Sequence, residues 1–284
     1  MTAPALPFSP DLIDDVLRRA LAEDVGAGDI TTLALVPADQ TGIAAAYAKE
    51  AGVLAGNAIA ARVFTLLDSA VHATPLCADG DVLTPGARFL RVEGPLQAIL
   101  TGERVALNSL RHLSGIATLT RAFVKAVEGT AAQIIDTRKT TPGLRLFEKY
   151  AVRVGGGQNH RIGLFDGVLI KDNHIAACGS VSNAVKKARA SVHHLLKIEI
   201  EAKTMEQVAE ALEAGADGIL LDNMSPDTMA QAVALVGGRA FTEASGNITL
   251  VSVRDAARSG VDLISVGMLT HSAPALDISL DIEG

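Results

Sequence analysis

The residues between Asp136 and His174 hold a local excess of positive charge. Seven Lys or Arg stand against four acids there, although the whole chain has a formal net charge of -7. The guanidinium of Arg pairs bidentately with carboxylates, whereas the ammonium of Lys is a mobile point charge suited to phosphate. The segment therefore predicts a site for an anion with both kinds of group, and its basic residues are Arg138, Lys139, Arg145, Lys149, Arg153, Arg161 and Lys171.

Lys171 ends the apolar run GVLIK, and its position fits two kinds of chemistry. An amine that its surroundings keep neutral is the nucleophile of Schiff-base enzymes. A lysine that stays charged would instead neutralise a diphosphate leaving group. The residue types alone leave both hypotheses open.

Glu201 and Asp222 end two neighbouring apolar runs, LKIEIE and GILLD. Carboxylate oxygens are hard ligands, so two acids on adjacent strand ends can share Mg²⁺, most readily an ion that arrives with a diphosphate. The same acids could instead form ion pairs with the lysines of the basic segment. We favour the metal hypothesis, because lysines and acids around a diphosphate do not exclude one another.

Two later segments, EASGNI and SVGM, combine glycine with small residues at the ends of apolar runs. Backbone N–H groups and a helix N-terminus at such positions can hold a terminal phosphate. The predicted phosphate-binding residues are Ser245, Gly246, Asn247, Val266, Gly267 and Met268.

These candidates all follow short apolar runs that alternate with helical patterns after Gly129. The six runs are QIIDT, GVLIK, LKIEIE, GILLD, RAFTE and DLISVG. Continuous apolar strands predict a parallel sheet covered by helices, and the carboxyl ends of such strands carry the site of an α/β barrel. A charged residue often bounds an apolar strand by chance, so the prediction rests on the whole ring of six.

The first half of the chain predicts a mixed α/β layer. Ser9 followed by Pro10 is typical of a helix start, and this helix should end near Gly26. Between residues 43 and 94 the apolar runs are short and are broken by Gly, Pro and Asp, which predicts strands, with one helix at AIAARVFTLL.

Two connecting helices are expected over residues 95–113 and 114–127, with Ser114 and Gly115 as the interruption. The final run, PALDISLDIE, alternates apolar and polar residues and predicts a strand that returns to the first domain.

The composition excludes several classes of protein. An acidic chain without Trp and with 3% aromatic residues is unlike a nucleic-acid binder or a protein bound to an anionic membrane. Neither a run that could cross a bilayer nor a signal-like start is present, so we expect a cytoplasmic protein. Cys77 and Cys178 lack metal-ligand spacing and are interpreted as inert thiols.

Longer strings resemble the quinolinate phosphoribosyltransferase family along nearly the whole chain. They are GDITT (28–32), GERVALN (102–108), LSGIAT (113–118), DTRKTTPGLR (136–145), EKYAVRVGGGQNHRIGLFDGVLIKDNHI (148–175), EIE (199–201), LLDN (220–223), EASGNI (243–248) and SVGMLTHS (265–272). The string around GGGQNHR and IKDNHI is the most specific of them.

The resemblance implies an α/β fold with an N-terminal α/β sandwich and an open, seven-stranded, TIM-like α/β barrel. The sandwich would span residues 1–113, with a returning strand at 273–284, and the barrel would span 114–272. It further implies a head-to-tail homodimer, which could assemble into a hexamer, with Arg104 entering the site of the partner subunit.

The resemblance also implies a reaction: quinolinate and phosphoribosyl pyrophosphate, with Mg²⁺, give nicotinate mononucleotide, pyrophosphate and CO₂. Lys139, Lys171, Glu201 and Asp222 would be catalytic, the last two as metal ligands. The substrate-binding set would be Arg104, Thr137, Arg138, Lys139, His160, Arg161, Lys171, Glu201, Asp222, Ser245, Gly246, Asn247, Val266, Gly267 and Met268.

The chain departs from the usual family pattern at Asn247, Met268 and Lys203, but Asn tolerates left-handed backbone and Met268 keeps its N–H. Three alternatives remain. They are a nicotinate phosphoribosyltransferase that does not decarboxylate, a lyase with a Schiff base at Lys171, and a related binding module associated with molybdenum transport. Retention of the RKTTPG, NHR and IKDNH strings argues against a repurposed site.

Overall fold

The computed structural model describes residues 9–283, which divide into two compact units. Within this range, unit 1 comprises residues 9–121, 140–156 and 270–283, and unit 2 comprises Ala122–Lys139 and Gly157–Leu269. Residues 1–8 lie outside the described residues. The prediction that the start of the chain is unlike a signal peptide falls partly on them. No helix in the described part is long and apolar enough to cross a membrane.

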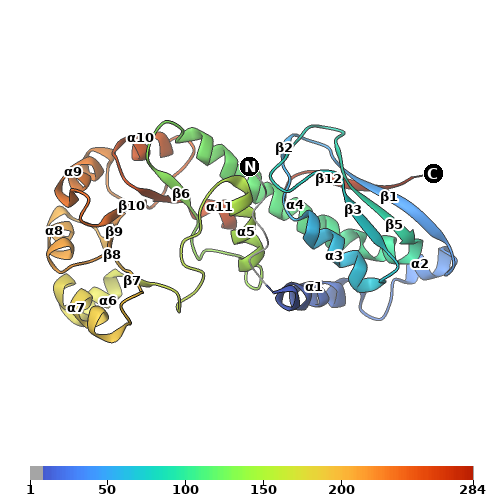
Figure 1. Cartoon of the computed structure of the whole chain (residues 1–284), viewed down its shortest axis with the longest axis horizontal. Coiled ribbons are helices and arrows are strands. Elements are labelled where there is room, and N and C mark those ends of the chain that lie inside the picture. Colours follow the sequence, from blue (N-terminus) through green and yellow to red (C-terminus); the bar gives the residue numbers. More distant parts are fainter. Residues whose placement is uncertain (1–8, 284) are drawn as a thin grey trace. The chain divides into compact units, whose positions relative to one another are not determined.

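Unit 1 contains an antiparallel sheet in the order β12-β1-β5-β3 (Figure 1). It also contains a separate two-stranded sheet formed by β2 and β4. Helix α3 packs against β3, and its side chains Ile59, Val63 and Phe64 are fully buried. The predicted α/β layer is therefore confirmed. The strands are β1 (Thr41–Ala48), β2 (Gly52–Val53), β3 (His72–Pro75), β4 (Val82–Leu83), β5 (Arg88–Pro95) and β12 (Ile278–Glu283), and the first helices are α1 (Pro10–Val25), α2 (Ile30–Leu35) and α3 (Asn57–Leu67).

Helix α1 begins and ends where the sequence predicts. Ser9 is its N-cap residue, Pro10 occupies the first turn, and Gly26 ends it with a φ of 51°. One stripe of the helix is buried and consists of Ile13, Leu17 and Leu21.

The final strand returns to unit 1, as predicted. β12 pairs with β1 in antiparallel register, with Leu280 opposite Ala46. Both residues are buried, so the C-terminal strand completes the hydrophobic core of this unit.

The prediction of two connecting helices is wrong, because α4 (Leu96–Ala126) is one helix of 31 residues. Gly115 lies in its interior, where a Cβ would stand 2.1 Å from the carbonyl oxygen of Pro274. This glycine permits close packing and does not break the helix. No structural break therefore coincides with the predicted boundary at 113/114, and unit 1 extends along α4 to Arg121.

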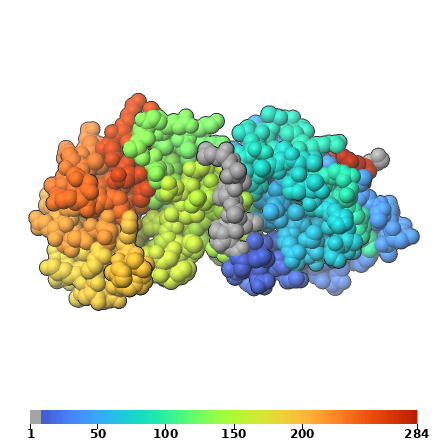
Figure 2. All heavy atoms as spheres, in the orientation of Figure 1, coloured from blue at the N-terminus to red at the C-terminus, as the bar shows by residue number. Residues whose placement is uncertain are grey.

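Unit 2 contains a parallel sheet in the order β6-β11-β10-β9-β8-β7, which includes all six predicted runs. Figure 1 shows the strands in an arc with helices on its outer side, and Figure 2 shows α6–α9, in yellow to orange, as a continuous surface. The strands are β6 (Gln133–Ile135), β7 (Val168–Ile170), β8 (Ile198–Ala202), β9 (Gly218–Asp222), β10 (Phe241–Ser245) and β11 (Leu263–Ser265). The remaining helices are α5 (Arg145–Gly155, in unit 1), α6 (Asp172–Cys178), α7 (Val181–Ser191), α8 (Met205–Glu213), α9 (Pro226–Val236), α10 (Val253–Arg258) and α11 (Met268–His271).

The sheet of unit 2 has six strands, one fewer than the resemblance implies. Next to β6, a single parallel bridge joins Ile135 to Gln158. The chain at Gln158 pairs through one residue only, so it forms no seventh strand. The α/β architecture with an open parallel sheet is as expected.

Candidate active site

The carboxyl ends of the parallel strands bring polar side chains onto one face of the sheet. Paired residues in a parallel sheet point to the same face, and so do residues two apart on one strand. Glu201 and Glu243 are both paired with Leu220 of β9. The polar residues that share this face are Glu199, Glu201, Asp222, Glu243 and Ser245.

Glu201 and Asp222 form an outer acidic pair beside Lys171. The Lys171 ammonium lies 3.5 Å from Oε2 of Glu201. Burial raises the pKa of Glu201, the charge of Lys171 opposes that rise, and the negative charge of Asp222 adds to it. Two carboxylates this close repel each other unless a cation offsets them, so their oxygens fit a hard divalent cation.

Lys171 is poorly placed for Schiff-base chemistry. Its side chain is 51% exposed, and its ammonium faces the Glu201 carboxylate. A Schiff-base lysine is activated by desolvation or by a second cation. The exposure and the acidic neighbour instead favour a lysine that acts as a point charge.

Arg138 and Arg161 place two guanidinium groups near each other. Burial lowers the pKa of Arg161, and the positive charge of Arg138 lowers it further. Nη1 of Arg161 donates to the carbonyl oxygen of Gly167 at 2.8 Å, which holds the side chain in place. Partly buried cations that repel each other gain most from an anion that accepts from both, so this pair fits a carboxylate.

Asp136 holds the loop that carries Arg161. Its side chain is fully buried. Its Oδ2 accepts from Nδ2 of Asn159 at 2.6 Å, and its Oδ1 accepts from the backbone N–H of His160 at 2.9 Å. Because Asp136 directly follows β6, the sheet fixes the start of this loop.

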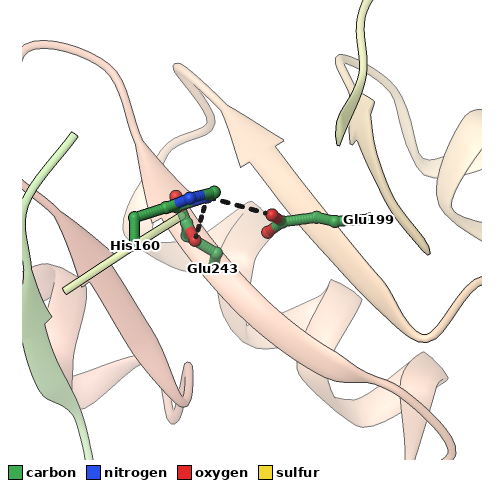
Figure 3. A group of neighbouring side chains, drawn as sticks. All are labelled: His160, Glu199 and Glu243. Carbon is green, nitrogen blue, oxygen red and sulfur yellow. Dashed lines mark hydrogen bonds and ion pairs between the residues drawn. The ribbon is translucent and has the colours of Figure 1, made fainter. Parts of the chain in front are cut away.

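The His160 ring lies between this loop and two buried acids, Glu199 and Glu243 (Figure 3). Nε2 of His160 is 3.1 Å from Oε2 of Glu199 and 3.7 Å from Oε2 of Glu243. Nδ1 of the ring accepts from the backbone N–H of Arg161 at 2.7 Å. Both ring nitrogens thus have partners inside the protein, and binding of a substrate carboxylate by His160 stays a prediction.

The loops after β9 and β10 are joined through Asn223. Its side-chain oxygen accepts from Nδ2 of Asn247 at 3.0 Å, and its backbone N–H donates to the carbonyl oxygen of Ser245. Asn247 has a φ of 51° and Gly246 a φ of 100°. The left-handed backbone expected to be tolerated at Asn247 is therefore present, and this turn stays a candidate for phosphate binding.

Val266 cannot bind phosphate in the predicted way. Its backbone N–H donates to the carbonyl oxygen of Ile135 at 3.0 Å, and its side chain is buried. A donor that completes the sheet ladder is not available to a ligand. Gly267 and Met268, which follow β11, remain candidates.

The predicted site residues fall in both units. Arg104 lies on α4 in unit 1, where its side chain is 53% exposed and lies 3.8 Å from the Glu103 carboxylate. Thr137 and Lys139 follow β6 in unit 2, and Oγ1 of Thr137 accepts from the Lys139 N–H at 3.0 Å. Every other predicted site residue also belongs to unit 2.

The basic segment of the sequence is likewise divided. Arg145, Lys149 and Arg153 lie on α5, which belongs to unit 1. Lys149 is 1% exposed, and Nε of Arg145 donates to Oγ1 of Thr140. The charge excess in unit 2 therefore comes from the other four residues, Arg138, Lys139, Arg161 and Lys171.

Three supporting residues, Asp136, Glu199 and Glu243, are absent from the site that the sequence predicts. Asp136 opens the basic segment and Glu243 opens the string EASGNI, but neither residue type indicated a supporting role. Glu199 stands two residues before Glu201, and this spacing on a strand puts both side chains on one face. That spacing was the available indication.

The fold and the site together define an α/β protein whose parallel sheet carries paired arginines, a lysine and paired carboxylates at its carboxyl edge. Family models for the two domains of quinolinate phosphoribosyl transferase match the chain, the N-terminal domain at residues 29–114 and the C-terminal domain at residues 116–281. The chain belongs to the quinolinate phosphoribosyl transferase family.

Curated relatives match nearly the full chain. A "probable nicotinate-nucleotide pyrophosphorylase [carboxylating]" of Bacillus subtilis is 49% identical over 267 residues, which cover 94% of this chain and 92% of the relative. A chloroplastic nicotinate-nucleotide pyrophosphorylase [carboxylating] of Arabidopsis thaliana is 45% identical, over 94% of this chain and 82% of the relative.

Solved structures are similar over the same extent. NadC from Streptococcus pyogenes is 46% identical and has a TM-score of 0.93, covering 98% of this chain and 99% of that one. The nicotinate-nucleotide pyrophosphorylase from Francisella tularensis is 39% identical with a TM-score of 0.93, covering 99% of both chains. A human nicotinic acid phosphoribosyltransferase, at 13% identity, a TM-score of 0.61 and coverage of 98% and 74%, shares the fold alone.

Proposed function

We propose that this chain transfers the phosphoribosyl group of phosphoribosyl pyrophosphate to quinolinate and releases pyrophosphate and CO₂, forming nicotinate mononucleotide for NAD biosynthesis. The observation that carries the proposal is the pair of nearby guanidinium groups of Arg138 and Arg161, next to a carboxylate pair and a lysine on one sheet edge. Quinolinate brings two carboxylates, and the second substrate brings a diphosphate. The site thus offers guanidinium groups to the carboxylates of quinolinate, and it offers a lysine and a pair of metal-binding acids to the diphosphate.

Arg138 and Arg161 would bind the dicarboxylate. Guanidinium forks bind carboxylates in fixed geometry, so the pair would orient the ring nitrogen of the acceptor toward the sugar carbon. Lys139 and Lys171 would stabilise the negative charge that grows on the departing diphosphate. Ser245, Gly246, Asn247 and the backbone at Gly267 and Met268 would hold the 5-phosphate.

Glu201 and Asp222 would hold Mg²⁺ together with the diphosphate. Their oxygens lie on one face of adjacent strands, and such hard donors are the ones that Mg²⁺ prefers. Bound Mg²⁺ would neutralise charge on the diphosphate. The Lys171 ammonium, 3.5 Å from Oε2 of Glu201, would offset the repulsion between the two carboxylates and the negative charge that grows on the leaving group.

Decarboxylation needs little from the protein. Once the ring nitrogen carries the sugar it is positively charged, and this charge stabilises the carbanion left when the adjacent carboxylate departs. Holding the remaining carboxylate is then the main task of the arginines. We propose no dedicated decarboxylating residue.

We further propose a homodimer in which Arg104 completes the site of the partner subunit, with a hexamer as a larger assembly. Support comes from the exposure of the Arg104 guanidinium on α4. A cytoplasmic location is also part of the proposal. Plant relatives are described as chloroplastic or mitochondrial, so location differs among members of the family.

The direct test incubates the purified protein with quinolinate, phosphoribosyl pyrophosphate and MgCl₂ and measures nicotinate mononucleotide and CO₂. Equal amounts of both products are expected. Product from nicotinate but none from quinolinate would overturn the proposal in favour of a transferase that does not decarboxylate. Borohydride trapping of a substrate on Lys171 would favour the lyase alternative.

A further inference from the structure

The imidazole of His160 connects the Arg161 loop to the inner face of the sheet. A neutral imidazole carries one N–H, so a ring whose Nδ1 accepts a hydrogen bond must carry its proton on Nε2. Nδ1 accepts from the Arg161 N–H at 2.7 Å, and Nε2 lies 3.1 Å from the Glu199 carboxylate. Nε2 therefore donates to Glu199, and this acceptor selects the tautomer that the Arg161 backbone requires.

Glu243 completes the surroundings of Glu199. It is 1% exposed, and neither of its carboxylate oxygens has a hydrogen-bond partner among the described residues. Burial and the negative charge of Glu199 raise the pKa of Glu243 well above its ordinary value of 4.5. Glu243 therefore holds its proton more tightly than an ordinary carboxyl, because a second negative charge beside Glu199 is costly in this buried position.

The same three side chains have the composition of a metal site, since their ligand atoms lie within 4.8 Å of one another. A neutral histidine that binds a metal through Nε2 carries its proton on Nδ1. In His160 that position already faces the Arg161 N–H at 2.7 Å. The hydrogen-bond pattern therefore favours a positioning network over a metal centre.

Three anchors hold the loop from different sides. Asp136 binds its beginning at Asn159 and His160, and Gly167 binds the Arg161 guanidinium. Among residues 9–283, the His160 ring is the one side chain that bonds to the Arg161 N–H, and its other nitrogen faces the buried acids of the sheet. A change at Glu199 would thus act on the Arg161 backbone through His160, and it would also remove the negative charge of Glu199, which raises the pKa of the Arg161 guanidinium.

We propose that Glu199, backed by Glu243, is a positioning residue that acts through His160 on the backbone of Arg161 and so orients the Arg161 guanidinium toward an aromatic dicarboxylate. The identity of the dicarboxylate as quinolinate rests on the proposed function. Glu199 itself touches no substrate. Its removal should therefore weaken quinolinate binding selectively.

The test compares Glu199→Leu, which removes the acceptor, with Glu199→Gln, whose amide oxygen can still accept from Nε2. Glu213→Gln, at the exposed end of α8, is the matched control. We expect the KM for quinolinate to rise about tenfold in Glu199→Leu. The KM for phosphoribosyl pyrophosphate should change little, and Glu199→Gln should restore most of the quinolinate affinity.

A second measurement reads the tautomer directly. In protein labelled with ¹⁵N-histidine, the His160 signals are identified by their loss in His160→Gln. The wild type and Glu199→Gln should show the Nε2–H tautomer. An Nδ1–H tautomer or an imidazolium at neutral pH in the wild type would overturn the proposal even if Glu199→Leu fails to fold.

Two further outcomes would also overturn it. One is an equal rise in KM for both substrates, or no rise for quinolinate, in folded Glu199→Leu. The other is stoichiometric binding of Zn²⁺ or Mn²⁺ that Glu243→Gln abolishes. Failure of the proposed function would instead appear as absent turnover in the wild type. The positioning role would then still be tested by titrating quinolinate in a calorimeter and by reading the His160 tautomer from the NMR spectrum.

Discussion

Two acidic pairs lie on the same face of the parallel sheet of unit 2, yet they differ in burial and in the partners that face them. The outer pair, Glu201 and Asp222, stands at the strand ends beside the ammonium of Lys171. The inner pair, Glu199 and Glu243, is 5% and 1% exposed and faces the His160 ring. A step of two residues along β8 separates Glu201 from Glu199.

The difference shows how one sheet supports two tasks. Carboxylates near solvent can bind and release cations, because the cost of changing partners is small there. An unpaired buried charge is costly, so Glu199 keeps its hydrogen bond to His160, and Glu243, which has none among the described residues, holds its proton more tightly. The outer pair therefore suits the ligand, and the inner pair suits the loop that binds the ligand.

The largest effect should come from two lysines, Lys171 at the outer pair and Lys139 after β6. Lys171→Ala and Lys139→Ala should fold normally and lower kcat by roughly 10²–10³-fold, because each removes charge opposite the departing diphosphate. Steady-state assays and circular dichroism measure both properties, with Lys186→Ala on the exposed face of α7 as control. Full activity in both variants would contradict the assignment of the outer pair.

A smaller effect is expected from Arg161→Lys, which keeps the charge but loses the guanidinium fork. The KM for quinolinate should rise about tenfold, equivalent to about 1.4 kcal/mol. Arg258→Lys on α10 is the control. In the double variant with Glu199→Leu, the free-energy change derived from the KM for quinolinate should be less than the sum of the two single changes if the inner pair acts through Arg161. Strict additivity would show that the inner pair does not act through the Arg161 loop.

The outer carboxylates should control the response to metal. Glu201→Gln and Asp222→Asn should each raise the Mg²⁺ concentration for half-maximal rate severalfold, because each removes a charged oxygen ligand. Rates measured across a Mg²⁺ titration at saturating substrates test this. An unchanged Mg²⁺ response in both variants would mean that the diphosphate alone holds the ion.

The inner pair should affect stability more than turnover, through Glu243. Its pKa in the folded protein lies well above the ordinary 4.5, so above pH 4.5 the unfolded chain loses this proton before the folded one does. Stability should therefore fall as pH rises from 4.5 toward the folded pKa, by about 1.4 kcal/mol for each unit of pKa difference.

Glu243→Gln has no such proton, so its urea midpoint should depend less on pH over this window. The two proteins should differ least at the acidic end. Parallel midpoints at all pH values would show that Glu243 titrates normally in the folded state.

Much of the fold follows from the sequence. The six apolar runs after Gly129 became the six strands of the parallel sheet, and Ser9, Pro10 and Gly26 marked the limits of α1. These features are local, since strand runs and helix caps depend on neighbouring residues. Gly115 misled because its role is set by Pro274, far away in the chain.

The site was predicted in part for the same reason. The basic residues from Arg138 to Lys171 form one segment in sequence, but α5 takes three of them into unit 1. Val266 ends an apolar run like its neighbours, but its N–H is bound to β6. Neither the membership of α5 in unit 1 nor the hydrogen bond of Val266 can be inferred without knowing which distant segments contact each other.

The sequence by itself determined which residue types follow each apolar run, because strand composition and strand ends are written locally. Only the tertiary structure decided which acids of different strands share a face, how deeply each is buried, and which nitrogen of His160 meets Glu199 and which meets Arg161. Burial and strand register depend on contacts between distant segments. These contacts distinguish the outer pair from the inner pair, although Glu199 and Glu201 stand two residues apart.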